Sequence, residues 1–145
     1  MKTAPAFQID DRRGLVVRCS PESNSAPIGS ITQKIELFDG SKRIGHSLWY
    51  SSGTIDGHVQ ILELEITDQF RRQGYGSRLL RIVRDEANRF LNRSDAQLRR
   101  ITIEVPHKTQ VIGRAFLTKH GFHHVETLHQ VLIKQDLLIY QLGMN

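Results

Sequence analysis

The feature that most constrains the fold is a change of hydrophobic period midway along the chain. Residues 58–67, HVQILELEIT, alternate as a strand does. This alternation predicts two faces, one with Leu62, Leu64 and Ile66 and the other with Ile61, Glu63 and Glu65. Nine residues further on, the pattern becomes helical. Apolar residues then recur with the spacing of one helix face at Leu79, Leu80, Val83, Ala87, Phe90 and Leu91.

Shorter patterns on both sides of this block complete the order of elements. Before it, residues 7–9 and 14–19, 31–38 and 43–52 read as an antiparallel meander, with Asp39–Gly40 supplying a hairpin turn. After it come a β-branched strand over 100–105, a short helix over 109–120 ending at Gly121, and two strands at 123–128 and 136–142. The order predicts an α/β (α+β) fold, and 145 residues suit a single domain spanning 1–145.

Charge and composition exclude several classes of protein. The net charge is +5, and arginines are concentrated between residues 71 and 100, which favours an anionic ligand or partner. No apolar stretch approaches the ~20 residues of a membrane span, and no secretory signal is recognised. The single cysteine, Cys19, reads as a packed thiol in a strand and fits a reducing cytoplasm. The histidines match no standard zinc spacing, so no metal is expected.

Glycines and arginines meet at the junction between the strand and the helix, in QFRRQGYGSRLL. The first turn of a helix has unpaired N–H groups and partial positive charge, and glycine lets the backbone approach a ligand closely. Phosphate is therefore the expected ligand, bound by N–H groups from about Arg72 to Ser77. The junction does not match G-x-x-x-x-G-K-[ST], and G-x-G-x-x-G lacks its third glycine because Leu79 stands there.

What remains is R-x-x-G-x-G, spelled by Arg71 to Gly76 between a strand and an amphipathic helix. In that setting the motif resembles the acyl-CoA motif of the GNAT superfamily of acetyl-CoA-dependent N-acetyltransferases. The strand and helix downstream, closing with Gly121–Phe122, are also similar to that family, and the resemblance covers residues 58–122 well. It implies a mixed, mostly antiparallel sheet with two main helices, splayed central strands and reduced N-terminal helices.

The resemblance also implies where acetyl-CoA would bind as acyl donor. Main-chain groups of Leu64 and Ile66 would contact its pantetheine arm. The pyrophosphate would be wrapped by Arg71, Arg72, Gln73, Gly74, Tyr75, Gly76 and Ser77.

Acetyl transfer to an amine needs a group that accepts the amine proton and a proton for the departing thiolate. Glu104 is the first candidate for the base, with Glu63 and Glu65 as alternatives on the other flanking strand and His107 as a lesser one. Many members of the family carry a tyrosine four residues before the Gly-Phe pair, where this chain has Leu117. Either another group donates this proton (Tyr140, Tyr75 or a water molecule), or the thiolate leaves unassisted, or the domain binds acyl-CoA without efficient catalysis.

Three functions remain open. The leading one is an N-acetyltransferase that acts on a primary amine, either a small molecule or a peptide. The second is an acyl-CoA-binding module with a sensing or scaffolding role, which Leu117 favours. A nucleic-acid-binding domain is disfavoured because no recognition motif accompanies the basic helix. A second copy of the chain is an open alternative as partner, and no membrane partner is expected.

Overall fold

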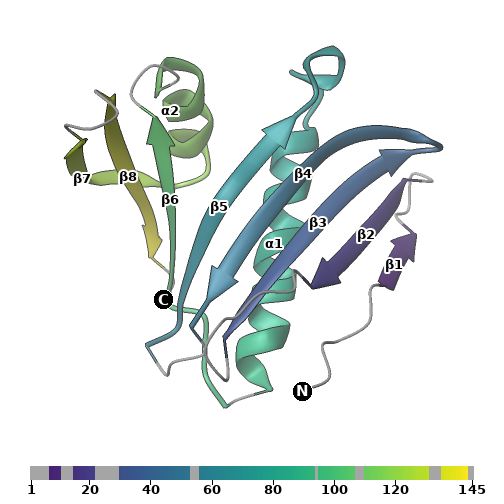
Figure 1. Ribbon diagram of the computed structural model, residues 1–145, viewed down its shortest axis with the longest axis horizontal. Helices are drawn as coiled ribbons and strands as arrows, with labels where there is room; N and C mark the ends of the chain where they lie inside the picture. The colour runs from purple at the N-terminus through teal and green to yellow at the C-terminus, as the bar shows by residue number, and fades with distance from the viewer. Residues whose placement is uncertain are drawn as a thin grey trace.

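The computed structural model describes residues 7–10, 15–21, 30–52, 56–93, 95–106, 110–130 and 135–143. Its strands form one eight-stranded sheet in the order β1-β2-β3-β4-β5-β6-β8-β7 (Figure 1). The strands are β1 (Phe7–Asp10), β2 (Val16–Pro21), β3 (Ile31–Asp39), β4 (Lys42–Ser51), β5 (His58–Ile66), β6 (Arg100–Pro106), β7 (His123–Gln130) and β8 (Gln135–Gly143). Only β5 and β6 pair in parallel, so the expected mixed, mostly antiparallel sheet is confirmed.

The first five strands form the meander that the alternating pattern predicts. In β3, Gln33, Ile35 and Leu37 are buried while the residues between them are half-buried, as the alternation requires. Among the described residues that precede β3 there is no helix, which agrees with the expected reduction of the N-terminal helices.

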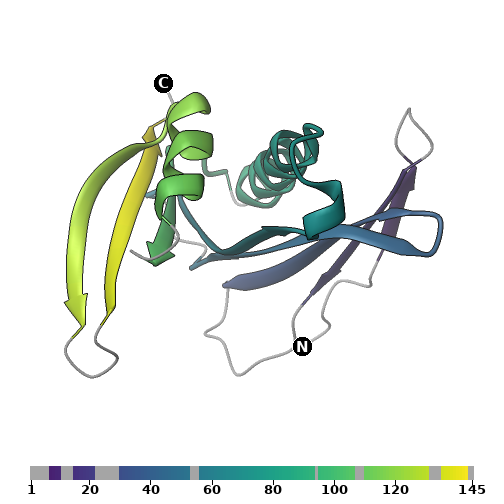
Figure 2. The same ribbon diagram turned by 90° about the horizontal axis from the view of Figure 1, so that it is seen from above.

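Helix α1 (Tyr75–Asn92) and helix α2 (Gln110–Lys119) cover the same face of the twisted sheet (Figure 2). The connection from β5 through α1 to β6 is the crossover that a parallel pair of strands needs. The buried face of α1 consists of the predicted Leu79, Leu80, Val83, Ala87 and Leu91, together with Glu86.

Glu86 is the unexpected member of that face, since it is only 6% exposed. Its carboxylate accepts a hydrogen bond from Gln33 Nε2 at 3.2 Å and lies 3.2 Å from a guanidinium nitrogen of Arg89. Gln33 Oε1 in turn accepts a hydrogen bond from Trp49 Nε1 at 2.8 Å. A buried carboxylate is stable only when it is paired in this way, so the network fixes α1 against β3 and β4 at one position.

Cys19 lies next to this network and is fully buried. Burial, followed by the negative charge of Glu86, raises the pKa of its thiol to about 12. The thiolate is thus not populated near neutral pH, which confirms the prediction of a packed, unreactive cysteine.

Helix α2 ends as its sequence predicts. The Phe122 N–H donates to the Leu117 carbonyl at 2.9 Å, and Gly121 N–H donates to Thr118, so Gly121 occupies the position after the cap. Thr109, the expected N-cap, lies outside the described residues. None of the described helices combines the length and the apolar character that crossing a bilayer would need.

Candidate functional site

Strands β5 and β6 are paired along only part of their length. The parallel register runs from His58 opposite Arg100 to Ile61 opposite Ile103, and no pairing is recorded beyond it. Strand β5 nevertheless continues to Ile66 and β6 to Pro106, and the two diverge toward the end where α1 and α2 begin (Figure 1). The expected splayed central strands are thus present, and the region in which they are unpaired is called the gap below.

A β-bulge in β5 lies where the gap opens. Trp49 of β4 is opposite Ile61, whereas the preceding Leu48 is opposite Glu63, so Leu62 is the extra residue. Ile61 is fully buried and Leu62 is 44% exposed. The expected face assignment was therefore wrong for these two residues. The bulge reverses the alternation, and Ile61 shares the helix-covered face with Leu64 and Ile66.

The bulge also determines which main-chain groups of β5 point into the gap. Thr67 N–H donates to the Ile44 carbonyl of β4 at 2.8 Å, and the Glu63 carbonyl accepts from Ser47 Oγ at 2.7 Å. Because main-chain groups alternate in direction along a strand, those of Leu64 and Ile66 point away from β4. Arg71 Nε confirms this direction for Ile66, whose carbonyl it contacts at 3.1 Å.

Gly45 holds β4 and β5 in unusually close contact beside the gap. A Cβ atom on this residue would lie 2.5 Å from the Glu65 carbonyl oxygen and 2.6 Å from Ile66 Cδ1. Only glycine allows the two backbones to approach in this way. The rear side of the gap-lining segment is therefore rigidly supported.

The loop after β5 ends in a helix terminus that no side chain caps. Gly74 is the N-cap of α1, with φ 84°, and makes no side-chain cap hydrogen bond. The first helical hydrogen bond runs from Arg78 N–H to the Gly74 carbonyl at 3.2 Å. The N–H groups of Tyr75, Gly76 and Ser77 precede this bond and have no acceptor within the helix. Such a terminus favours an anion.

Several side chains of this loop contact the protein itself. Arg71 pairs with Asp68 at 3.1 Å, Gln73 Nε2 donates to the Gln69 carbonyl, and Ser77 Oγ lies 2.7 Å from His120 Nε2. A Cβ atom on Gly76 would lie 3.1 Å from the ring of Phe116 in α2, so this glycine also serves helix packing. In the predicted cradle, the groups that have no acceptor within the helix are therefore the backbone N–H groups of Tyr75, Gly76 and Ser77.

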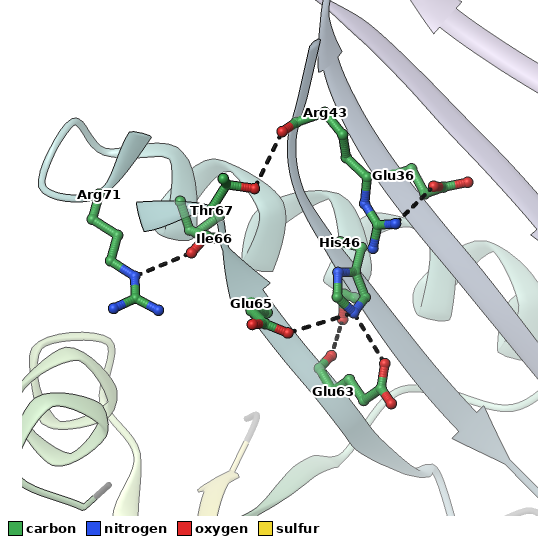
Figure 3. Close-up of polar contacts among 9 residues, drawn as sticks. Glu36, Arg43, His46, Glu63, Glu65, Ile66, Thr67 and Arg71 are labelled. Atoms are coloured by element: carbon green, nitrogen blue, oxygen red, sulfur yellow. Dashed lines mark hydrogen bonds and ion pairs between the residues drawn. The ribbon is translucent and has the colours of Figure 1, made fainter. Parts of the chain in front are cut away.

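The candidate bases lie on the sheet face opposite the helices. Gln60 Nε2 donates to Glu104 Oε1 at 3.3 Å across the last paired residues of β5 and β6. On the other side of the bulge, His46 Nε2 lies 3.0 Å from Glu63 and 4.0 Å from Glu65 (Figure 3). Both glutamates are exposed, whereas the His46 side chain is only 16% exposed.

His46 was missed from the sequence, because its position opposite the carboxylates depends on the register of two strands. A Gly45–Ile66 register across the second hairpin places it directly opposite Glu65. A lone histidine in a strand predicts nothing until that register is known, and the bulge shifts the register. The histidine and the two carboxylates form one polar cluster beside the gap.

The candidate proton donors are less accessible. Tyr140 in β8 is 3% exposed, lies opposite Ile103, and its ring centroid is 5.7 Å from that of His124. Leu117 is 2% exposed and belongs to the core. Tyr75 is half-buried at the start of α1, where its ring meets Phe70 edge to face. His107 lies outside the described residues.

No group of three or more metal-ligating side chains within the described ranges is arranged to hold a metal ion.

Neither a family model nor a curated protein matches the sequence. Solved structures do match. One, from Desulfovibrio desulfuricans and assigned to the GNAT family of acetyltransferases, has a TM-score of 0.62 at 16% identity, covering 79% of this chain and 69% of its own. The ribosomal-protein-S18-alanine N-acetyltransferase of Escherichia coli has a TM-score of 0.60 at 16% identity over 79% and 70%. A Bacillus subtilis acetyltransferase, solved with CoA, has a TM-score of 0.64 at 13% identity over 79% and 78%.

At these identities the likeness concerns the fold. The chain has the fold of the GNAT acetyltransferases.

Proposed function

We propose that the protein is an N-acetyltransferase that moves an acetyl group from acetyl-CoA to a primary amine. The observation that carries the proposal is one continuous arrangement. Beyond Ile61, β5 has no pairing with β6, the main-chain groups of Leu64 and Ile66 point away from β4, and the chain then leads to the uncapped N-terminus of α1.

Acetyl-CoA fits this arrangement as the acyl donor. Its diphosphate needs several N–H donors and positive charge, which the amides of Tyr75, Gly76 and Ser77 supply together with the helix dipole. Its pantetheine arm carries amide groups that need main-chain partners. The main-chain groups of Leu64 and the N–H of Ile66 point away from β4, whereas the Ile66 carbonyl already accepts from Arg71 Nε. Arg72 and Gly74 have positive φ, of 63° and 84°, and shape the intervening loop.

The amine would approach from the sheet face that the helices leave open, where the carboxylates lie. An alkylamine with a pKa near ~10 is mostly protonated at neutral pH, so a base must remove its proton before the nitrogen can attack. Glu104 is the proposed base because it stands where β5 and β6 separate. Glu63, oriented by His46, is the second candidate.

The balance of the reaction is simple. The amine nitrogen forms a bond to the acetyl carbon while the bond from that carbon to sulfur breaks. A protonated amine gives up two protons in all. The first goes to the carboxylate before the attack, directly or through water. The second leaves the nitrogen as the amide forms and goes to the departing thiolate through water or Tyr75, or to solvent when the thiolate leaves as such. The Leu64 or Ile66 N–H would stabilise the negative charge that develops on the acetyl oxygen.

A second function rests on a specific observation. Leu117 stands where many relatives have a tyrosine, and Tyr140 is nearly fully buried. A protein that lacks an efficient proton donor could bind acyl-CoA and transfer the acetyl group slowly or not at all. An acyl-CoA-binding module with a sensing or scaffolding role is therefore the alternative.

Two measurements separate these functions. Thermal unfolding is followed with and without acetyl-CoA, and release of CoA is followed with a thiol reagent while a panel of primary amines is supplied. The enzyme is expected to be stabilised by acetyl-CoA and to release CoA only when a suitable amine is present. Stabilisation without release across the panel would support the binding module, and no stabilisation would contradict both functions.

Gly74 offers a matched pair of variants for the binding step. A Cβ atom at this residue would meet nothing within 4 Å, and Asp and Asn are the residues that best tolerate its positive φ. Gly74→Asp places a carboxylate beside the first-turn amides, whereas Gly74→Asn has the same shape without charge. Loss of acetyl-CoA binding in the aspartate variant alone is expected. Equal affinity in the two variants would contradict the placement of the diphosphate here.

A further inference from the structure

A small pocket lies between the two helices, beside the first turn of α1. It has a volume of about 120 Å³ and is lined by Ser77, Leu80, Arg81, Arg84 and His120. The four residues from α1 recur at helical spacing and form one side of the helix, and His120 directly follows α2. It is called the inter-helix pocket below.

The inter-helix pocket has positive and hydrogen-bonding walls. Arg81 and Arg84 are exposed on its rim, and Leu80, which is 2% exposed, forms its apolar floor. Ser77 Oγ and His120 Nε2 lie 2.7 Å apart, so a hydroxyl and an imidazole are held side by side within it. The composition suits an anion with several oxygen atoms better than an apolar or cationic group.

The surroundings of His120 also affect its charge state. Partial burial, followed by the charges of Lys119 and Arg84, lowers the pKa of His120 below its ordinary value. The imidazole is therefore neutral at neutral pH and can donate or accept one hydrogen bond beside the arginines.

The inter-helix pocket adjoins the proposed diphosphate site, because Ser77 belongs to both. At a rise of 1.5 Å per residue, Arg81 lies about 6 Å and Arg84 about 10 Å beyond Ser77 along the axis of α1. The gap lies beneath both helices, since α1 follows β5 and α2 follows β6 on one face of the sheet (Figure 2). A ligand that extends outward from the gap past the first turn of α1 would therefore reach the space between the helices.

Coenzyme A carries a third phosphate group on its ribose, joined through that sugar to the diphosphate. We propose that the inter-helix pocket binds the 3′-phosphate of coenzyme A, and that Arg81 and Arg84 distinguish coenzyme A from its 3′-dephospho form. This inference rests on the proposed function for the position of the diphosphate. It adds that two arginines outside the R-x-x-G-x-G motif contribute to the affinity for coenzyme A.

The test compares the affinities of coenzyme A and 3′-dephospho-coenzyme A by titration calorimetry. For the unaltered protein, about tenfold tighter binding of coenzyme A is expected, comparable to one additional charge-assisted hydrogen bond. In the double variant Arg81→Gln/Arg84→Gln this preference should disappear, while binding of the dephospho form stays the same. Both arginines are exposed, so the double variant should fold normally, and its circular dichroism and melting temperature verify this.

Arg93→Gln is the matched control, since Arg93 is an exposed arginine at the opposite end of α1. It removes positive charge from the same helix and should leave the preference intact. A loss of preference in this control as well would indicate a general charge effect and overturn the assignment to the inter-helix pocket.

The other outcomes are equally distinct. Equal binding of both ligands by the unaltered protein would overturn this inference and leave the proposed function standing. Binding of neither ligand would instead contradict the proposed function. A preference that survives in the double variant would place the 3′-phosphate elsewhere. As a second measurement, adenosine 3′,5′-bisphosphate should displace coenzyme A more effectively than ADP does, and equal displacement would contradict the inference.

Discussion

The two halves of β5 have the same neighbour on one side and different surroundings on the other. Strand β4 accompanies β5 from Gln60 to Ile66, whereas β6 pairs with it only from His58 to Ile61. In the first half, Val59 and Ile61 are fully buried, and Gln60 and Ile61 are paired with a strand on both sides. In the second half, one edge of the backbone is left open to the gap.

The difference shows how one strand can provide both stability and a binding site. The paired half belongs to the core, and its substitutions should affect the free energy of unfolding. The open half is held from behind by Gly45 and by Ser47, so its main-chain groups keep their direction without a second strand. Four predictions test this division, beginning with the largest expected effect.

The first prediction concerns Ile61 and Leu62, the residues on either side of the boundary between the paired and the open half of β5. Ile61→Ala should lower the free energy of unfolding by about 2–5 kcal/mol, because it leaves a cavity in the core. Leu62→Ala should change it by less than about 0.5 kcal/mol, because the side chain is exposed on the bulge. Urea unfolding followed by circular dichroism measures both. Similar losses in the two variants would contradict the reversal of faces at the bulge.

The second prediction concerns the carboxylates of the open face. Glu104→Gln should lower kcat about 100-fold, equivalent to about 2.7 kcal/mol, if this carboxylate accepts the amine proton. Acetyl-CoA should still stabilise the variant against heat, and the loss should diminish at high pH, where the amine deprotonates by itself.

Glu63→Gln is the matched comparison on β5. If Glu63 only holds His46 in position, or has no role in catalysis, Glu63→Gln should lower kcat much less than Glu104→Gln does. The reverse order of the two losses would transfer the role of base to Glu63 and its histidine.

The third prediction uses two serines on β4 that make equivalent contacts with the two halves. Ser47 Oγ donates to the Glu63 carbonyl at 2.7 Å in the open half, and Ser51 Oγ donates to His58 at 3.3 Å in the paired half. Each Ser→Ala change should cost about 1 kcal/mol of stability. Only Ser47→Ala should also weaken binding of acetyl-CoA, measured by calorimetry. Equal weakening in both variants would mean that the contact of Ser47 with the open half has no special role in binding.

The fourth and smallest effect is a dependence of stability on pH in the paired half. Burial, followed by the positive charge of Arg100, lowers the pKa of His58 below its ordinary value of 6.5. When the pH falls through about 6.5, the unfolded chain therefore takes up a proton before the folded chain does, and stability decreases. Urea unfolding at about pH 7.5 and 5.5 should show a smaller decrease in His58→Gln than in the unaltered protein. An identical decrease would contradict the lowered pKa.

Much of this arrangement could be predicted from local patterns. The period of α1, the strand that Pro106 closes and the motif from Arg71 to Gly76 depend on residues close together in sequence. Each was found within a residue or two of its predicted place. The splayed strands were predicted only through the resemblance to a family, since no pattern within either strand specifies where their pairing ends.

What the sequence did not reveal depends on contacts between distant residues. The bulge at Leu62 looks like regular alternation because the extra residue is itself apolar, so the faces of Ile61 and Leu62 were exchanged. His46 acquires its carboxylate neighbours only through the register of a hairpin. Gly76 was explained by its closeness to a ligand, whereas its contact with Phe116 of α2 is equally demanding.

The buried pairing of Glu86 with Gln33 has a consequence for the distant end of α1. The helix turns by about 100° and rises 1.5 Å with each residue, so Glu86 lies about 16 Å from the first-turn amides. Because the helix is stiff, a contact that fixes its rotation about its axis at Glu86 also fixes the rotation of its first turn. The directions of the Tyr75, Gly76 and Ser77 N–H groups are thus set in part by a carboxylate that no ligand at that end could touch. A buried contact in the interior therefore helps to orient the proposed anion-binding groups at the surface.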